Sequence, residues 1–257
     1  MAGKTEVAVK NDNPFGVALS EKLDSVADAL PKDFSRARFV QNCLALLNDD
    51  PDKYQKFGSK QLMANLLKGA YLDLDFFNKQ AYLVPYGDKL EFMPSYTGQI
   101  KLAKKYSIRP IKEIYAKVIR EGDVFEEVIT NGEPSVNFRP KFLNDGAIIG
   151  AFAVVLYQDS GMSYDVMSKA DIENTRKSSK AKNSPAWSNF YSEMAKKTVL
   201  RRLCKHIDLD FESAKQRATY DEDMALDDPQ KLNEIQVEAE ANSVEFVPFD
   251  VTEGKAE

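Results

Sequence analysis

The sequence predicts an α+β protein, in which a meandering antiparallel β-sheet packs with helices, after an N-terminal helix pair and before an acidic C-terminal tail. Two observations predict this class. Segments with helical periodicity occur in groups, whereas in an α/β protein they would alternate with the strands. The strand-like segments are also separated by turn signals, such as Asn131-Gly132 and Ser160-Gly161, which join antiparallel neighbours.

The N-terminal helix pair is predicted over residues 34–48 and from Gly58 onward. In the first stretch Phe39, Cys43 and Leu47 recur at helical spacing, and "GSKQLMANLLKGAYL" repeats that pattern. Residues 1–30 are predicted to be a flexible segment. The folded core is therefore expected to span residues 31–218, and the acidic tail to span residues 219–257.

The first strands are predicted around a hairpin turn at Gly87-Asp88. This dipeptide separates two apolar and aromatic runs in "AYLVPYGDKLEFMPSY". Pro85 and Pro94 indicate an edge strand or bulges, because proline cannot donate a ladder hydrogen bond. A short helix is expected in "YTGQIKLAKKYS", and after Pro110 the chain reads as several turn-punctuated strands.

The last helices of the core carry recognisable start signals. Ser168 is predicted to cap a helix, with Asp171 three residues later in the position of a capping box. Pro185 fits the first turn of a helical region, since proline is tolerated there. That region contains the sequence "NFYSEMAKKTVLRRLCKHI".

Length and composition limit the class of protein. With 257 residues and 43% hydrophobic content, the chain can bury one large core, alone or with appendages. No run approaches the roughly 20 apolar residues of a membrane-spanning helix, and no secretion signal is recognisable, so a cytoplasmic location is expected.

Cys43 and Cys204 lie in apolar helical patterns and are predicted to be buried thiols. With His206 as the sole histidine, no structural metal is expected.

Charge is distributed unevenly along the chain. Residues 1–100 contain 12 basic and 13 acidic side chains, and residues 101–207 contain 19 basic and 12 acidic ones. Residues 208–257 contain 4 basic and 15 acidic side chains. A basic core followed by an acidic tail is the pattern expected when one segment binds a polyanion and another repels it or recruits a partner.

Two predicted helices place cations on the side opposite their apolar face. At about 100° per residue, Lys197, Arg201 and Lys205 share one stripe, and the apolar positions of that helix centre on the other side. The helix in "QIKLAKKY" repeats this arrangement, with cations at Lys101, Lys104 and Lys105. The alternative is an ordinary solvated helix surface, neutralised in part by an i,i+4 pair between Glu193 and Lys197.

A loop rich in cations and hydroxyl groups connects the predicted helices. Its sequence, "TRKSSKAKNSPAWSNFY", ends in three aromatic residues. Cations bind phosphates and aromatic faces stack on exposed bases, so single-stranded nucleic acid is the ligand that fits this combination best. For Trp187 the alternative is a place in the core or in a subunit interface. The candidate DNA-binding residues are Tyr86, Tyr96, Lys101, Lys104, Lys105, Arg109, Lys112, Arg176, Lys177, Lys180, Lys182, Trp187, Lys197, Arg201, Arg202 and Lys205.

Enzyme signatures are weak by comparison. Gly3-Lys4-Thr5 ends like a phosphate-binding loop, but the glycine that such a loop requires upstream is missing. Glu126 and Glu127 would face opposite sides of a strand, which disfavours a nuclease metal site, and Asp171 is explained by capping. The sequence therefore predicts a non-enzymatic protein without cofactors. A passive binder of single-stranded DNA or of RNA is the alternative function.

Four blocks of sequence, between about residues 60 and 207, carry a family resemblance. They are "YLDLDFFNKQAYLVPYGDKLEFMPSYTGQIKLAKKY", "REGDVFE", "GAFAVVLY" and "TRKSS…PAW…EMAKKTVLRRL". In these blocks the chain resembles the RecT family of phage single-strand DNA annealing recombinases. The positions that match the family are Tyr86, Gly87, Tyr96, Gly98, Arg176, Trp187, Met194, Lys197 and Arg201.

The resemblance implies a function as well as a family. It implies ATP-independent annealing of complementary DNA strands in homologous recombination, binding of single-stranded DNA and of the annealed duplex, and assembly into rings or helical filaments. It also implies a phage exonuclease as partner and a phage or prophage origin in a bacterial host. It does not indicate which of the matching residues contact DNA.

The acidic tail contains one apolar cluster. Within residues 226–257, "EFVPFD" places Phe246, Val247, Pro248 and Phe249 among acidic neighbours. Such a cluster could dock on the exonuclease or on a host single-strand-binding protein, while the surrounding charge competes with DNA. The alternative is an inert, solubilising tail.

Overall fold

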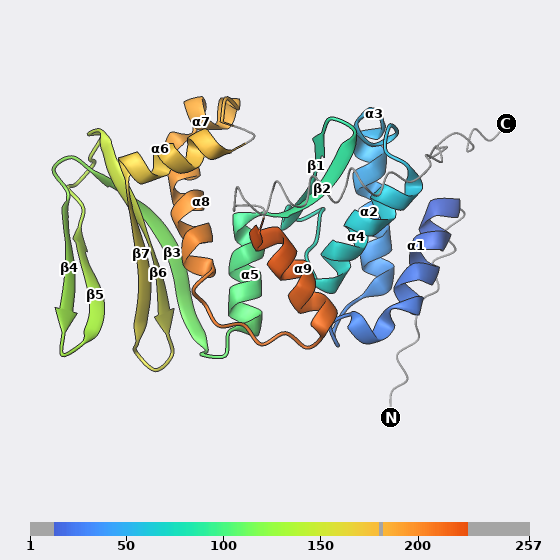
Figure 1. The fold of residues 1–257 in the computed structure, drawn as a ribbon, viewed down its shortest axis with the longest axis horizontal. Helices are drawn as coiled ribbons and strands as arrows, with labels where there is room; N and C mark the ends of the chain where they lie inside the picture. The colour runs from blue at the N-terminus through green and yellow to red at the C-terminus, as the bar shows by residue number, and fades with distance from the viewer. Residues whose placement is uncertain (1–12, 180–181, 226–257) are drawn as a thin grey trace. The chain divides into compact units, whose positions relative to one another are not determined.

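The computed structural model describes residues 13–179 and 182–225, which form parts of two compact units. The first unit comprises residues 1–98 and 211–257, and the second comprises residues 99–210. Helices and antiparallel strands occur in both (Figure 1), which confirms the predicted α+β class. In the described ranges no helix is both long and apolar enough to cross a membrane.

The first unit is mainly helical. Its elements are α1 (Pro14–Ser25), the 3-10 turn η1 (Ala27–Ala29), α2 (Arg36–Asp49), α3 (Pro51–Tyr54), α4 (Ser59–Tyr71), β1 (Ala81–Tyr86), β2 (Lys89–Pro94) and α9 (Ala214–Ala225). The predicted helix pair corresponds to α2 and α4, which bury their apolar stripes. Because α9 crosses residue 218, the expected start of the acidic tail falls inside a helix whose Tyr220 is buried.

Helix α1 was not predicted from the sequence, which was expected to be flexible over residues 1–30. The Asn13 side chain accepts hydrogen bonds from the backbone N–H groups of Phe15 and Gly16, and so caps the helix. Phe15, Leu19 and Leu23 then recur every four residues and are buried. The predicted flexible segment over residues 1–30 therefore does not extend past Pro14 in the structure, and residues 1–12 lie outside the described residues.

The hairpin of β1 and β2 is attached to α4 by a buried side-chain amide. Asn65 Nδ2 donates to the Leu90 carbonyl at 2.8 Å, and Asn65 Oδ1 accepts from the Phe92 backbone N–H at 2.9 Å. Between the two strands Gly87 has φ +65°, the left-handed conformation that glycine adopts at little cost. The predicted turn at Gly87-Asp88 is thus confirmed.

The second unit contains the larger sheet. Its elements are α5 (Tyr96–Tyr106), which begins at the boundary of the units, then β3 (Ile111–Arg120), β4 (Val124–Thr130), β5 (Glu133–Arg139), β6 (Ile148–Tyr157), β7 (Met162–Ser168), α6 (Lys169–Ser178), α7 (Pro185–Asn189) and α8 (Tyr191–Cys204). All strand pairs are antiparallel, with order β3-β6-β7 in one sheet and β4-β5 in another. The sequence predicted one meandering sheet. The structure instead has two separate sheets here, because β4 and β5 pair with each other and not with β3 or β6.

The β4-β5 hairpin and α8 cover opposite faces of the three-stranded sheet (Figure 1). On the hairpin face, the rings of Phe125 and Phe138 both lie 5.0 Å from the ring of Phe152, measured between centroids. On the other face α8 contacts β3, β6 and β7. The central strand β6 is consequently buried on both faces over most of its length.

Both cysteines are free and buried, as predicted. Burial is the main cause that raises the pKa of Cys43, with a smaller contribution from the negative charge of Asp75. Burial also raises the pKa of Cys204 to about 12. Neither thiol is therefore activated at neutral pH.

Candidate nucleic-acid interface

Helix α8 carries the cations from which the sequence pattern predicted an anion-binding surface. Its buried residues are Ala195, Val199, Leu200, Leu203 and Cys204, which form the face that packs on the sheet. Lys197 and Arg201 are partly exposed, and Lys205, directly after the helix, is exposed. The predicted division into an apolar and a basic face is confirmed. Glu193 pairs with Lys196 at 2.5 Å, three residues away.

Helix α5 is built in the same way. Leu102, Ala103 and Tyr106 are buried, while Lys104 and Lys105 are exposed in the last turn. Lys104 Nζ lies 3.6 Å from the Glu113 carboxylate of β3, an exposed pair of the kind that contributes little to stability. This end of the helix therefore keeps a basic character.

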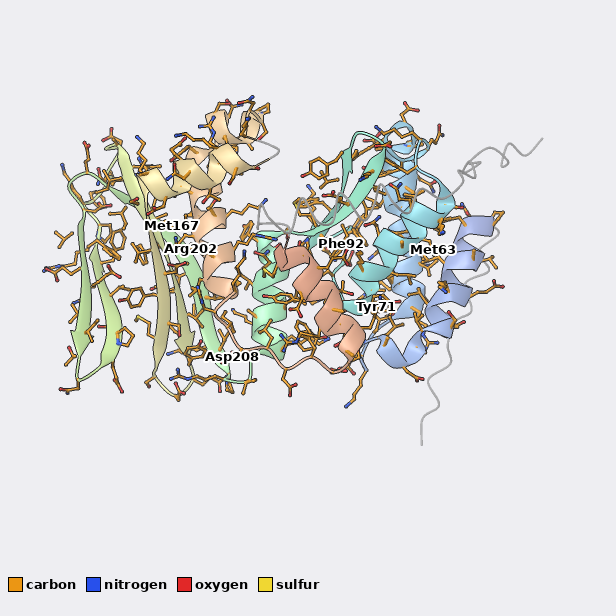
Figure 2. All side chains as sticks on the ribbon, viewed as in Figure 1. Met63, Tyr71, Phe92, Met167, Arg202 and Asp208 are labelled. Carbon is orange, nitrogen blue, oxygen red and sulfur yellow. The ribbon has the colours of Figure 1, made fainter. Side chains whose placement is uncertain are left out.

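The C-terminal ends of α5 and α8 are joined by backbone hydrogen bonds. The N–H of Ile108 donates to the Asp208 carbonyl at 3.0 Å, and the N–H of Asp210 donates to the Tyr106 carbonyl at 2.8 Å. The segment that follows α8 is thus paired with the end of α5. Asp208 and Asp210 are exposed there too, and Figure 2 labels Asp208, so this region carries charges of both signs.

Arg109 is held by its own chain. Its Nε and Nη2 atoms donate to the Asp159 carboxylate at 2.5 and 2.7 Å, and its guanidinium lies 4.1 Å from the Tyr157 ring centroid. The hydrogen bonds from Arg109 are the main cause that lowers the pKa of Asp159. A Cβ atom on Gly161 would lie 1.7 Å from Arg109 Nη2, so any other residue at position 161 would require the Arg109 side chain to shift.

Arg202 forms a second internal clamp. Both its Nε and an Nη atom donate to the Asp165 carboxylate of β7, and Nη2 also donates to the Val166 carbonyl at 2.6 Å. Figure 2 shows Arg202 on α8, next to the sheet. This fork geometry satisfies the guanidinium and fastens α8 to the sheet, whereas sequence reasoning assigned Arg202 to DNA.

The segment after α6 is organised around Trp187. This side chain is only 4% exposed, and its ring contacts Tyr191 and the guanidinium of Arg176. Trp187, a candidate for base stacking, therefore has no open ring face in the structure, and the core alternative describes it better. Lys177 and Lys182 are exposed, and Lys180 lies outside the described residues.

The remaining candidates are distributed over both units. Tyr86, at the end of β1, is half-buried, and Tyr96, the first residue of α5, is 48% exposed. Both tyrosines belong to the unit that contains residues 1–98, while Lys112 is exposed on β3 of the other unit. Gly98, which matches the family, has a reason in the fold, because a Cβ atom there would lie 2.1 Å from the Gln80 carbonyl oxygen.

Phe190 is an aromatic residue that the candidate set omitted. It links α7 to α8 and is 63% exposed, in contrast to the buried Trp187. The sequence offered a signal, since Phe190 falls outside the apolar stripe of α8. An exposed ring directly before α8 is suited to stacking on a base.

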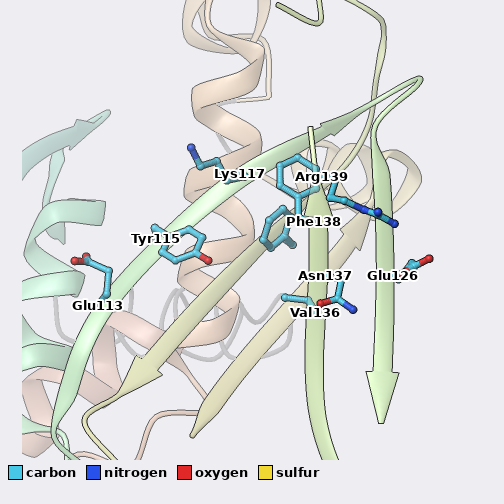
Figure 3. Close-up of a pocket in the computed structure, with 9 residues that line it drawn as sticks. Glu113, Tyr115, Lys117, Glu126, Val136, Asn137, Phe138 and Arg139 are labelled. Carbon is cyan, nitrogen blue, oxygen red and sulfur yellow. The ribbon is translucent and has the colours of Figure 1, made fainter. Parts of the chain in front are cut away.

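A groove between β3 and the β4-β5 hairpin was also not anticipated. It has a cavity volume of about 870 Å³ and is shown in Figure 3, with Tyr115 of β3 and Phe138 of β5 at its walls. Glu113 and Glu126 balance Lys117 and Arg139 along its lining, so it does not select for an anion.

Carboxylates in the described ranges do not gather into a metal-binding cluster with three or more ligating side chains. Asp171 forms the predicted capping box with Ser168, in which each residue's side chain bonds to the backbone of the other. The Ser168 hydroxyl also donates to the Asp171 carboxylate at 2.6 Å, and this hydrogen bond is the main cause that lowers the pKa of Asp171.

Comparison with known proteins gives a consistent result. The model of the RecT family matches residues 37–239. The protein RecT of Escherichia coli (strain K12) is 27% identical over 220 residues, which cover 81% of this chain and 80% of that protein. The uncharacterized protein YqaK of Bacillus subtilis (strain 168) is 28% identical over 169 residues, which cover 65% of this chain and 57% of YqaK.

Proposed function

Because the chain belongs to the RecT family, we propose that it is an ATP-independent DNA single-strand annealing protein that acts in homologous recombination. The family match over residues 37–239 carries this proposal, because it spans most of both structural units. The protein binds single-stranded DNA, holds it for pairing and retains the annealed duplex. No chemical step is involved, so the protein is not an enzyme and needs no cofactor.

The physical requirements of annealing agree with this composition. Base pairing returns about 1.4 kcal/mol per stacked step on average, so the reaction needs no fuel once the strands meet. The protein has to reduce repulsion between phosphates and keep the bases accessible. Lysine side chains meet the first requirement by displacing counterions, and exposed aromatic rings meet the second.

The described surface suggests which residues take these roles. We assign phosphate contacts to exposed or partly exposed cations on α5, β3, α6 and α8 and in the segments that follow α6 and α8, and stacking to Phe190 and Tyr96. The assigned cations are Lys101, Lys104, Lys105, Lys112, Lys177, Lys182, Lys197, Arg201 and Lys205. Arg109 and Arg202 are left out, because each donates two hydrogen bonds to a carboxylate of its own chain.

Annealing over useful lengths requires several copies side by side on one strand, because one subunit of this size covers only a few nucleotides. We propose a homo-oligomer with open, heterologous contacts, as a ring or a helical filament. A phage exonuclease that exposes the strand is the proposed partner, and the cytoplasm of a bacterial host is the proposed location.

Annealing assays distinguish this function from passive binding. We expect the purified protein to accelerate duplex formation between complementary oligonucleotides without ATP, as measured by quenching of a labelled strand. The same mixtures, viewed by electron microscopy with long DNA, should contain rings or filaments. A protein that slowed duplex formation, or that remained as isolated monomers on DNA, would instead be a passive binder of single strands.

The acidic tail is assigned a regulatory and recruiting role. Residues 226–257, with the apolar cluster at Phe246–Phe249, lie outside the described residues. A tethered polyanion competes with DNA, and salt screens this competition. Deleting residues 226–257 is expected to raise DNA affinity at low salt, as measured by fluorescence anisotropy, and to lower recombination in cells. An unchanged affinity together with unchanged recombination would identify the tail as inert.

A further inference from the structure

Arg176 makes three different contacts within the second unit. Its Nε donates to the Lys182 carbonyl at 3.0 Å, and its Nη1 lies 3.6 Å from the Glu173 carboxylate. The guanidinium lies 5.5 Å from the centroid of the Trp187 ring. One side chain of α6 therefore holds both the chain before α7 and the aromatic residue inside α7.

The residues around this contact form a small, partly buried cluster. The ring centroids of Trp187 and Tyr191 lie 6.0 Å apart, so the cluster continues from α7 into the first turn of α8. Burial, followed by the hydrogen bond with the Glu173 carboxylate and its negative charge, raises the pKa of Tyr191 to about 12, so this phenol stays neutral at physiological pH. Together these contacts connect α6, α7 and α8.

The turn between α7 and α8 buries one aromatic side chain of this region and exposes another. Trp187 and Phe190 are three residues apart, yet their exposed fractions are 4% and 63%. The backbone N–H of Phe190 donates to the Ala186 carbonyl at 2.9 Å, so the two residues move as one turn. Phe190 leaves the helical backbone as the C-cap of α7, with φ −134° and ψ 44°, so holding Trp187 in place also holds the backbone from which the exposed Phe190 ring projects.

We infer that Arg176 is a positioning residue, which holds the turn between α7 and α8 so that Phe190 and Lys182 can engage single-stranded DNA, and that it does not bind a phosphate itself. This inference rests on the proposed binding of single-stranded DNA. The role requires arginine, because a lysine keeps the charge but has neither the fork that reaches two acceptors nor the planar group that stacks on Trp187.

Arg176→Lys separates positioning from phosphate binding. Trp187 is the sole tryptophan of the chain, so its fluorescence reports on the cluster without DNA. We expect Arg176→Lys to shift this emission to the red, to increase its quenching by acrylamide, and to weaken binding to a labelled oligonucleotide about tenfold, the loss of roughly one stacked base. Arg176→Ala should weaken binding to a similar extent.

Arg36→Lys is the matched control. Arg36 pairs with Asp24 at 2.8 Å on the surface of the first unit, and this substitution should change neither the emission nor the affinity. The inference is overturned if Arg176→Lys keeps the unsubstituted protein's affinity, or if it loses affinity while the Trp187 emission stays unchanged. Failure of the unsubstituted protein to bind DNA would contradict the proposed function. In that case the Trp187 emission of the variants, measured without DNA, would still show whether Arg176 holds Trp187 in place.

If Arg176→Lys loses its far-ultraviolet circular dichroism, the variant is unfolded and a second variant tests the inference. Glu173→Ala removes one support of Arg176 and makes the surface more basic by one charge. Phosphate attraction alone predicts tighter DNA binding by this variant, whereas positioning predicts weaker binding together with a red-shifted Trp187 emission. Tighter or unchanged binding would overturn the inference.

Discussion

Reversing the charge of Lys197 and Arg201 together, by substitution with glutamate, is expected to weaken binding to single-stranded DNA by about tenfold or more at moderate salt. Both side chains lie on the face of α8 that does not pack against the sheet. Each lost phosphate contact should also make the plot of log affinity against log salt less steep by about one, hence by about two for the pair. Fluorescence anisotropy at several salt concentrations measures both quantities.

Lys22→Glu with Lys32→Glu is the matched control. These two lysines are exposed on the first unit, and their reversal changes the net charge of the protein by the same amount. We expect a much smaller loss of affinity and an unchanged salt slope. Equal losses in the two double variants would mean that only overall charge matters. An unchanged slope in the Lys197 and Arg201 variant would mean that these cations do not contact phosphates.

Phe152→Ala is expected to destabilise the second unit by about 3–5 kcal/mol. Phe152 is 1% exposed, and its ring lies between those of Phe125 and Phe138. Its removal leaves a cavity where the β4-β5 hairpin meets the sheet. Urea unfolding should show the loss as a lower midpoint, and hydrogen exchange should show faster exchange in β4 and β5 than in β6.

Ile129→Ala provides the control for this prediction. Ile129 is in the same hairpin but is 72% exposed, so truncating it should change the free energy of unfolding by no more than about 0.5 kcal/mol. If Phe152→Ala lowered the free energy of unfolding by as little as Ile129→Ala, the hairpin would not depend on the contact between the aromatic rings. Loss of exchange protection along β6 as well would mean that the sheet and the hairpin unfold together.

Local patterns predicted most of the secondary structure correctly. The apolar spacing around Phe39 and Cys43 predicted α2, Gly87-Asp88 predicted the turn between β1 and β2, and the Ser168 capping box predicted the start of α6. Each of these signals lies within a few residues of the feature that it specifies. The start of α1 was missed, although Asn13 and the buried residues that follow it carry a similar signal.

The division of the strands could not be predicted in this way. The turn at Asn131-Gly132 correctly indicated a hairpin, and both residues have positive φ values of 54° and 84°. Whether that hairpin continues the sheet or leaves it depends on what its side chains contact. Phe125 and Phe138 pack on Phe152, a contact between residues far apart in the chain, so the hairpin covers the sheet as a separate layer.

The sequence by itself determined the α+β class, the helical and strand segments, the buried thiols, the family and the presence of a basic face on α8. The tertiary structure alone decided which candidate residues are engaged within the protein. Arg109 meets Asp159 across 50 positions of sequence and Arg202 meets Asp165 across 37, while Trp187 is covered by Arg176. Periodicity and capping are set by neighbours along the chain, whereas ion pairing and burial depend on residues that only folding brings together.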